Sequence, residues 1–424
     1  MSVYLDNLTD CQRKAMDLMV SGENIFITGP GGVGKSLLIK LYRSTFHTKK
    51  LIGMTSTTGV SALLIGGNTL HSFLGIGLGT GSIDYLYDMI QRNPKKKKIW
   101  KKVATLIIDE VSMLSPDLFD KLEVLARMLR ENDKPFGGIQ LILTGDFFQL
   151  PVVESTKLCF EAESWNKCIT NIIELTEIIR QTDVSFQTCL NELRLGKISK
   201  ESKNLLQSRV GAKLENNSGI KPTKLYSTNS KVDDINNKEL DKLLDDDRDI
   251  YQFKMNCKYY GSLYNREKIV EKYKKNCLFS DEIQLCVGAQ VMLVYNIDTE
   301  GGLVNGSRGI ITSFIQDRPV VKFLEGREEI VDFNVWNFEE DGELIMTIKQ
   351  IPLKLAWAFT IHKIQGSTLD FVELDLTNIF EYGQAYVALS RVRKIEGLSL
   401  SGIDFSRIKA HPKALDFYEK IKSL

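Results

Sequence analysis

Residues 25–36 read IFITGPGGVGKS, an apolar run followed by a glycine-rich loop that ends in lysine and serine. The loop at 29–36 satisfies the pattern G-x-x-x-x-G-K-[ST]. A strand-like run precedes it and the helix-like LLIKLYR follows it, which is the context that the pattern requires. The stretch therefore predicts a phosphate-binding loop (P-loop) between a strand and a helix, and an α/β fold around it.

The loop residues have separate expected roles at a bound nucleotide. Backbone N–H groups of such a loop bind phosphate oxygens, aided by the positive end of the following helix. We expect the Lys35 ammonium to reach the β- and γ-phosphates and the Ser36 hydroxyl to bind Mg²⁺. An ordinary glycine-rich turn is the alternative. The predicted nucleotide-binding positions in this stretch are Gly29, Gly31, Gly32, Val33, Gly34, Lys35, Ser36 and Leu37.

Two further apolar runs end in polar residues suited to the same chemistry. VATLIIDE ends at Asp109 and Glu110, which a parallel sheet would present at its carboxyl edge, beside the P-loop. Asp109 is predicted to hold Mg²⁺ through water and Glu110 to activate the attacking water, with a solvated acidic turn as the alternative. In TGDFFQLP (144–151), Gln149 is predicted to sense the γ-phosphate, while Phe148 fits a core or a base-stacking position equally well.

The pattern along the chain predicts two α/β domains. Strands spaced by amphipathic helix-like segments indicate a parallel sheet covered on both faces. Strand-like runs recur at 224–227, 371–376 and 398–400, which indicates a second α/β domain. The strand-like runs of the first half lie at 25–28, 51–54, 103–108, 140–144 and 171–175.

Composition limits the class without naming a function. The 424 residues are 43% hydrophobic and 26% charged, with a net charge of +1 that neither requires nor excludes a nucleic-acid partner. No apolar run approaches the ~20 residues that span a bilayer, and the N-terminus resembles neither a signal nor a transit peptide. Seven scattered cysteines without a C-x-x-C pair favour reduced thiols. We therefore expect a soluble intracellular protein.

The motifs occur in an order that resembles a known family. LTDCQRKAMDL, GPGGVGKS, TSTTGVSALLIGGNTLHSFLGIG, LIIDEVSML, TGDFFQLP, ELTEIIRQTD, LVNGSRG, AWAFTIHKIQGSTLD and GQAYVALSRVRKIEGL follow one another between about Leu8 and Gly402. Together they resemble the motif set of Pif-type, RecD-like DNA helicases, the 5′→3′ branch of superfamily 1.

The resemblance implies two RecA-like lobes and an ATP-driven motor. The N-terminal lobe would span 1–195 with a wedge insertion at about 73–102, and the C-terminal lobe 196–424 with a β-barrel insertion at about 250–355. Its cofactors would be ATP and Mg²⁺, and its partners single-stranded DNA and tailed or forked duplexes. It would act as a monomer that couples ATP hydrolysis to 5′→3′ translocation and unwinding.

The resemblance also assigns individual residues. Gln12 would read the adenine edge, and the basic run at 95–102 lies where the family places its wedge. The catalytic set would be completed by the two γ-phosphate arginines, and the DNA contacts would come from three loops. The catalytic residues are then Lys35, Glu110, Gln149, Arg180 and Arg391, and the DNA-binding residues are Thr57, Thr58, His71, Phe148, His362 and Lys363.

Three positions depart from the family pattern: Val152 replaces a second proline, Ile179 a common aromatic residue, and Ile364 a small residue. These differences affect local DNA contacts and remove no catalytic group. Three other functions are alternatives. A translocase could strip proteins from a strand without unwinding duplexes, a P-loop kinase or switch GTPase would lack the 362–398 motifs, and a non-catalytic binding module would not need an intact Lys35 and Glu110.

Overall fold

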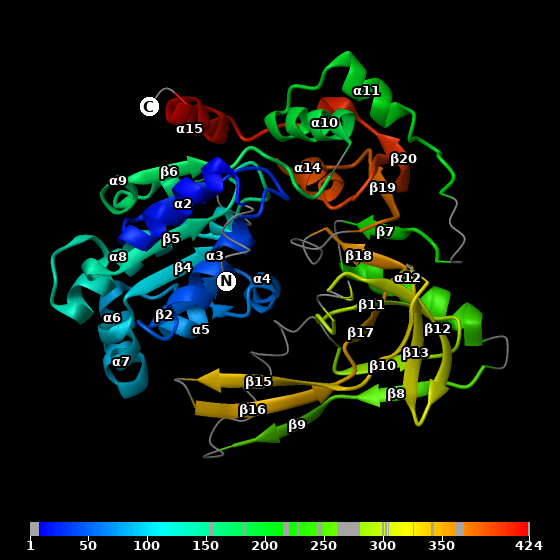
Figure 1. Cartoon of the computed structure of the whole chain (residues 1–424), viewed down its shortest axis with the longest axis horizontal. Helices are drawn as coiled ribbons and strands as arrows, with labels where there is room; N and C mark the ends of the chain where they lie inside the picture. Colours follow the sequence, from blue (N-terminus) through cyan, green and yellow to red (C-terminus); the bar gives the residue numbers. More distant parts are fainter. Residues whose placement is uncertain are drawn as a thin grey trace. The chain divides into compact units, whose positions relative to one another are not determined.

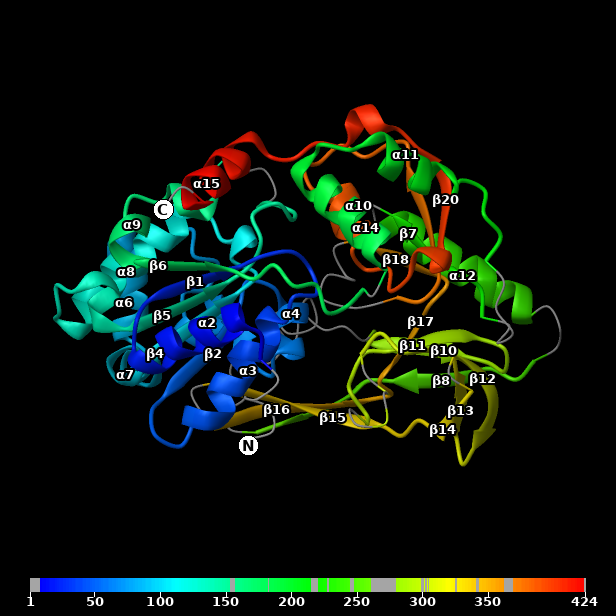
Figure 2. The same cartoon turned by 45° about the horizontal axis from the view of Figure 1, so that its top comes forward.

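The computed structural model describes residues 8–422 except 153–156, 182, 215–219, 227–228, 245–247, 261–279, 299–300, 302, 304, 325, 341–342 and 362–368. The chain forms two compact units (Figures 1 and 2). Unit 1 comprises Met1–Ser199, Phe380–Val387 and Ile408–Leu424, and unit 2 comprises Lys200–Ile379 and Ala388–Arg407. No helix among the described residues is long and apolar enough to cross a membrane.

Unit 1 contains a six-stranded parallel sheet with strand order β3-β2-β4-β5-β1-β6. Parallel neighbours need crossover connections, and helices supply them here. The predicted runs of the first half correspond to strands of this sheet. The strands are β1 (Ile25–Thr28), β2 (Ile52–Ser56), β3 (Asn68–Thr69), β4 (Thr105–Asp109), β5 (Gln140–Thr144) and β6 (Asn171–Glu174).

The helices of unit 1 begin at recognisable sequence signals. Thr9 and Gln12 form a reciprocal capping box at the start of α2, and Ser115 caps α8 before a proline. Other helices begin at Ser82, Asn93 and Asp183 caps. They are α2 (Asp10–Ser21), α3 (Lys35–Phe46), α4 (Gly59–Leu64), α5 (Leu70–Leu74), α6 (Ile83–Gln91), α7 (Pro94–Lys102), α8 (Pro116–Arg130), α9 (Trp165–Cys168), α10 (Val184–Leu195), α14 (Gln384–Leu389, which continues into unit 2) and α15 (Pro412–Lys422).

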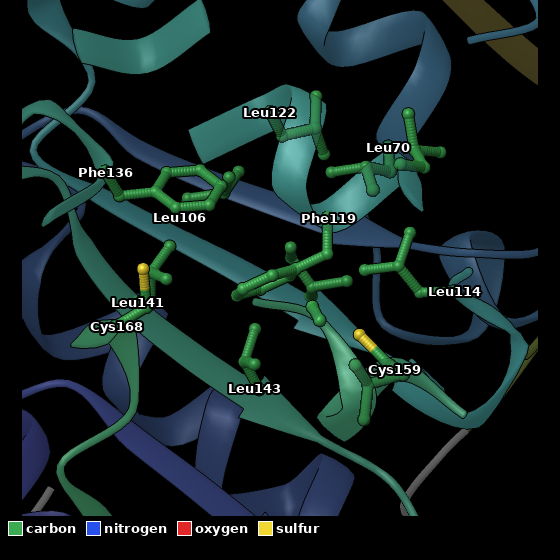
Figure 3. Packing of buried hydrophobic residues seen from close by; sticks show 14 of the residues in the cluster. Leu70, Leu106, Leu114, Phe119, Leu122, Phe136, Leu141, Leu143, Cys159 and Cys168 are labelled. Atoms are coloured by element: carbon green, nitrogen blue, oxygen red, sulfur yellow. The ribbon is translucent and has the colours of Figure 1, made fainter. Parts of the chain in front are cut away.

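Strand residues alternate between two cores, one on each face of this sheet. Ile25 and Ile27 of β1 belong to the cluster that includes residues of α2 and α3, whereas Phe26 belongs to the cluster that includes residues of α6 to α8. Figure 3 shows the second cluster, in which Leu106, Leu141 and Leu143 point toward Phe119 and neighbouring side chains. Because successive strand side chains point to opposite faces, short continuous apolar strands supply both cores.

The C-terminal segment belongs to unit 1, which differs from the predicted assignment of 196–424 to the second lobe. Phe417 of α15 stacks on Phe160 with ring centroids 4.1 Å apart, and Tyr418 stacks on Phe148 at 4.7 Å. Burial of these aromatic rings stabilises the helix against the first unit. The spacing of apolar residues in α15 indicates a helix, but not the surface on which it packs.

The residues predicted as a wedge insertion, 73–102, include two helices that contribute to the core of unit 1. Leu86 and Ile90 of α6 and Trp100 of α7 are buried in the cluster of Figure 3. The Trp100 indole donates a hydrogen bond to the Leu74 carbonyl at 2.9 Å. Helices α6 and α7 are therefore packed parts of this unit, and a strand-separating role for the segment remains a prediction.

Unit 2 is built on a four-stranded parallel sheet with strand order β18-β7-β19-β20. Its sheet and helices are β7 (Thr223–Tyr226), β18 (Ala358–Thr360), β19 (Val372–Leu376), β20 (Leu398–Ile403), α11 (Lys200–Gln207) and α12 (Asn229–Leu244). This α/β arrangement agrees with the predicted second α/β domain.

Antiparallel strands occupy the part of unit 2 in which a β-barrel insertion was predicted. Among the described residues they pair as β10-β8, β14-β13-β12-β11-β17 and β15-β16-β9, which are separate small sheets. Closure into a barrel remains a prediction. The strands are β8 (Tyr251–Lys254), β9 (Asn256–Tyr259), β10 (Glu282–Leu285), β11 (Gln290–Leu293), β12 (Arg308–Ile315), β13 (Arg318–Phe323), β14 (Glu328–Ile330), β15 (Asn334–Glu340), β16 (Glu343–Gln350) and β17 (Leu353–Leu355).

Candidate active site

The P-loop follows β1 and leads into α3, as the sequence predicts. Two of its glycines are required by close approaches. Gly29 has a φ of +133°, and a Cβ there would lie 2.2 Å from the Leu175 carbonyl oxygen. A Cβ on Gly32, whose φ is +88°, would lie 2.6 Å from the Cβ of Arg180. The loop is therefore held between β1 and the segment that follows β6, and only glycine fits at these positions.

Lys35 lies at the start of α3, with its ammonium close to the loop. Its Nζ donates to the carbonyl oxygens of Gly29 at 2.7 Å and Pro30 at 2.9 Å. Burial lowers the pKa of Lys35, although the carboxylates of Asp146 and Glu110 act in the opposite direction. Asp109 also acts on this lysine, and β4, β5 and β1 pair in parallel, so the strand ends and the P-loop lie at one edge of the sheet.

Asp109 and Glu110 stand at the end of β4. Asp109 Oδ1 accepts hydrogen bonds from the Thr144 hydroxyl and, at 3.0 Å, from the Glu110 N–H. Burial raises the pKa of Asp109, and these two hydrogen bonds oppose the shift. Glu110 has a φ of +55°, in the left-handed region that is uncommon for residues other than glycine. Such a turn gives Glu110 a different direction from Asp109, in keeping with separate predicted roles.

The predicted adenine and γ-phosphate residues Gln12 and Arg180 both lie beside the P-loop. Gln12 Nε2 donates to the Val33 carbonyl at 3.0 Å, while Gln12 Oε1 accepts from the Thr9 N–H at 3.1 Å. The N–H groups of Ile179 and Arg180 donate to the Gly32 carbonyl at 2.9 and 3.3 Å. The structure thus brings both residues to the loop, and Gln12 also links α2 to it.

The predicted DNA-contacting turn after β2 is joined to the acidic strand end. The Thr57 hydroxyl donates to the Glu110 carbonyl at 2.9 Å, and the Thr57 N–H donates to the Asp109 carbonyl at 3.3 Å. Thr58 directly precedes α4, and its hydroxyl accepts from the Ser61 N–H at 3.2 Å. His71 lies in α5, half-buried. A DNA contact at Thr57 would therefore act directly on the backbone of Glu110.

The predicted base-stacking role of Phe148 is wrong. Its side chain is 2% exposed, its ring stacks on Tyr418, and the Arg194 guanidinium lies 4.8 Å from its centroid. No face of the ring remains for a nucleotide base. Of the two interpretations that the sequence allowed, the structure supports the core position.

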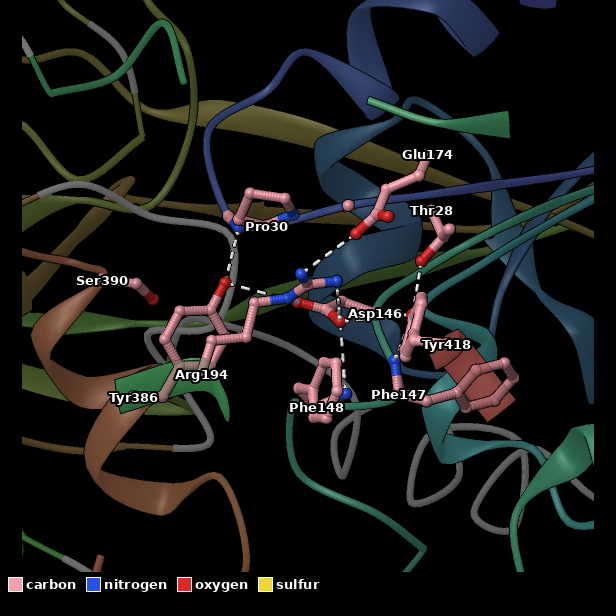
Figure 4. Close-up of polar contacts among 12 residues, drawn as sticks. Thr28, Pro30, Asp146, Phe147, Phe148, Glu174, Arg194, Tyr386, Ser390 and Tyr418 are labelled. Carbon is pink, nitrogen blue, oxygen red and sulfur yellow. Dashed lines mark hydrogen bonds and ion pairs between the residues drawn. The ribbon is translucent and has the colours of Figure 1, made fainter. Parts of the chain in front are cut away.

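A buried polar network, missed by the sequence analysis, surrounds Asp146 (Figure 4). Arg194 of α10 donates to both Asp146 carboxylate oxygens, from Nε at 3.0 Å and Nη2 at 3.1 Å, and also pairs with Glu174 at 3.1 Å. Burial alone would lower the pKa of Arg194, but Asp146 together with Tyr418 and Tyr386 outweighs this effect and raises the pKa. Tyr386 and Tyr418 also donate to Asp146, each at 3.3 Å. The signal available in the sequence was Asp146 within TGDFFQLP, because a buried carboxylate needs partners.

The other predicted site residues are Gln149, Arg391, His362 and Lys363. Gln149 is buried, and its N–H donates to the Asp146 carbonyl at 2.9 Å. Arg391 belongs to unit 2, where its Nη2 donates to the Ser390 hydroxyl at 2.9 Å. His362 and Lys363 lie outside the described residues. The γ-phosphate roles of Gln149 and Arg391 remain predictions.

Comparison with known proteins places this geometry in a family. Residues 7–204 match the model of PIF1-like helicases, and residues 269–314 match the 2B domain of the DNA helicase Pif1. The crystal structure of Pif1 helicase from Candida albicans is 35% identical, with a TM-score of 0.80 over 98% of this chain and 99% of that one. The chain belongs to the PIF1-like helicase family.

Two further relatives show how much of each chain the similarity includes. The chain is 41% identical to the ATP-dependent DNA helicase PIF1 of Xenopus laevis over 97% of its own length, and it spans 64% of that relative's length. A Bacteroides Pif1 helicase in complex with ADP-AlF3 and ssDNA is 29% identical, with a TM-score of 0.65 over 98% of this chain and 97% of that one. The PIF1-like assignment confirms the predicted resemblance and the RecA-like fold class.

Proposed function

We propose that this PIF1-like chain is an ATP-dependent DNA helicase that translocates 5′→3′ on single-stranded DNA and unwinds tailed or forked duplexes. The observation that carries the proposal is the meeting of Lys35, Asp109 and Glu110 at one sheet edge. Burial lowers the pKa of Lys35, while the Glu110 and Asp109 carboxylates act in the opposite direction, so all three groups interact there. This arrangement suits hydrolysis of a nucleoside triphosphate, and the relatives named above are DNA helicases.

The residues present fit a Mg²⁺ ion bound with the nucleotide. Ser36 is exposed at the first turn of α3, and Asp109 ends β4, a core strand of the same unit. No cluster of three or more His, Cys, Asp or Glu occurs in the described part of the chain. One carboxylate, one hydroxyl and the phosphates themselves are the ligands that Mg²⁺ usually takes at such sites. When bound, the ion would neutralise charge on the phosphate oxygens.

The chain's own groups then divide the remaining work. The P-loop amides and Lys35 hold the phosphates, and Glu110 accepts the proton of the attacking water. Arg180 and Arg391 would stabilise the charge that develops on the γ-phosphate. Thr57 joins the predicted strand-contacting turn to the backbone carbonyl of Glu110 through a 2.9 Å hydrogen bond, which offers a route by which DNA could move Glu110 and stimulate hydrolysis.

Single-stranded DNA is expected to stimulate ATP hydrolysis, with an affinity that falls as salt rises, because phosphate contacts release counterions. A duplex with a 5′ tail should be unwound and one with a 3′ tail left intact. Steady-state ATPase and strand-displacement assays on both tailed duplexes would measure this. A rate of ATP hydrolysis that does not change with DNA would contradict the motor function. Preferential unwinding from a 3′ tail would contradict the 5′→3′ polarity. Stimulation of hydrolysis without unwinding would favour a translocase that strips proteins from the strand.

A second test concerns the lysines of α7. Lys98 and Lys102 are exposed, whereas Lys96 is buried and its Nζ donates to the Ser72 carbonyl at 2.8 Å. If α7 supports strand separation, K98A/K102A should lower unwinding more than DNA-stimulated hydrolysis. The slope of the logarithm of DNA affinity against the logarithm of salt concentration should fall by about one per lost phosphate contact. The variant must spare Lys96, because its loss would disturb the packing of α5.

The matched control for this test is K231A/K238A on α12, which removes the same charge from exposed positions of unit 2. Equal losses of unwinding in both double variants would show a general charge effect. Unchanged unwinding in K98A/K102A would remove α7 from any strand-separating role.

A further inference from the structure

The Tyr386 hydroxyl joins two parts of the nucleotide site. It accepts a hydrogen bond from the Gly31 N–H at 2.8 Å and donates one to Asp146 Oδ2 at 3.3 Å. The side chain is 1% exposed. Because a phenol carries one hydrogen and two lone pairs, both bonds can exist together. Figure 4 shows the Tyr386 hydroxyl between the P-loop and the Asp146 carboxylate.

Each partner of this hydroxyl orients a group with a predicted part in hydrolysis. Gly31 belongs to the P-loop, whose backbone N–H groups face the phosphates of a nucleotide. Asp146 begins the turn that carries Gln149, since the Asp146 carbonyl accepts the Gln149 N–H at 2.9 Å. A single side chain therefore restrains both the Gly31 peptide and the turn of the predicted γ-phosphate sensor.

Tyr386 lies next to a boundary between the two units in the sequence. It lies in α14, and the chain passes from unit 1 to unit 2 between Val387 and Ala388 of that helix. Arg391, the second predicted γ-phosphate arginine, follows shortly afterwards in the sequence. The hydrogen bond to Gly31 thus anchors the start of this segment at the P-loop.

We propose that Tyr386 is a positioning residue for ATP hydrolysis, whose hydroxyl holds the Gly31 amide and the Asp146–Gln149 turn in a fixed mutual orientation. The inference rests on the proposed ATPase function. Because the hydroxyl orients a P-loop amide and the turn of the predicted γ-phosphate sensor, its removal should affect the transition state more than the binding of ATP or ADP.

Tyr418 offers a matched comparison on the same carboxylate. Its hydroxyl donates to Asp146 Oδ1 at 3.3 Å, accepts from the Phe147 N–H at 3.2 Å and is bonded to the Thr28 hydroxyl. Its ring stacks on Phe148 and lies 5.0 Å from the Arg194 guanidinium. These contacts secure α15 to the core, whereas Tyr386 alone of the two tyrosines bonds to the P-loop amide of Gly31.

The test compares Y386F with Y418F in the full chain, since both changes remove one hydroxyl from Asp146 and keep the ring. Y386F is expected to lower kcat about tenfold, the factor that corresponds to one ordinary hydrogen bond, with the KM for ATP within about twofold of wild type. The affinity for ADP with aluminium fluoride should fall by a similar factor, while the affinity for ADP alone stays unchanged. Y418F, which leaves the Gly31 amide bonded to Tyr386, should lower the unfolding midpoint by about 2–4 °C and should lower kcat less than Y386F does.

Three outcomes would overturn the proposal: normal kcat in Y386F, equal losses of kcat in both variants, or equal weakening of ADP and the aluminium fluoride complex. The last two would show that the network only supports the fold. The wild-type protein, assayed alongside with and without single-stranded DNA, tests the proposed motor function independently of the variants. A wild type that hydrolyses ATP without DNA stimulation would contradict the motor but would still allow basal kcat to be compared between the variants.

Discussion

Glu110→Gln is expected to bind ATP normally and to lose hydrolysis by about 10²–10⁴-fold, because the amide cannot accept the proton of the attacking water. Glu110 adjoins Asp109 at the end of β4, and its carboxylate influences the pKa of Lys35. The substitution keeps the size of the side chain and leaves the P-loop and Asp109 in place. Nucleotide titration together with single-turnover hydrolysis would separate binding from chemistry.

The control for this variant is E163Q, which removes an exposed carboxylate of the same unit at a site remote from the chemistry in sequence. It should hydrolyse ATP at the wild-type rate. Near-normal turnover in E110Q would show that another group accepts the proton, and would contradict the role derived from the strand end. A loss of ATP binding in E110Q would instead show that the Glu110 carboxylate contributes to binding of the nucleotide before the chemical step.

Arg391→Ala is expected to reduce turnover by about 10³–10⁵-fold, the range that arginine fingers supply in related phosphoryl transfers. ATP binding should weaken far less, because the P-loop makes most ground-state contacts. Arg391 is 2% exposed in unit 2, so the unfolding midpoint must be measured beside the kinetics. R391K keeps the charge but loses the planar fork, and should recover only part of the rate.

Arg393 provides the matched control for Arg391. It belongs to the same segment, is 48% exposed and pairs with Asp370 at 3.1 Å. R393A should retain turnover within about twofold, since exposed ion pairs contribute little. Normal turnover with lost ATP binding in R391A would reverse the assignment of Arg391. Equal rate losses in R391A and R393A would point to a general disturbance of the segment.

The packing partners of Phe148 and of α15 could not be predicted from sequence patterns. An aromatic residue after a strand suits a core or a nucleotide base equally well, and the decision depends on whether another side chain covers the ring. Tyr418 covers it, from a helix far along the chain. The apolar spacing of α15 predicts a helix with one buried face, yet it contains no information on which unit that face contacts.

The phosphate-binding part of this protein could be predicted from residues close together in its sequence. The strand, the P-loop and the acids at the end of β4 are recognisable because their chemistry depends on residues that are adjacent or evenly spaced in the chain, and parallel strands bring their ends to one edge. The network around Asp146, in contrast, could not be predicted from the sequence. Gly31 and Tyr386 are separated by 355 positions, and Phe147 and Tyr418 by 271. The partners of a buried polar group are set by packing in three dimensions, which local spacing does not encode.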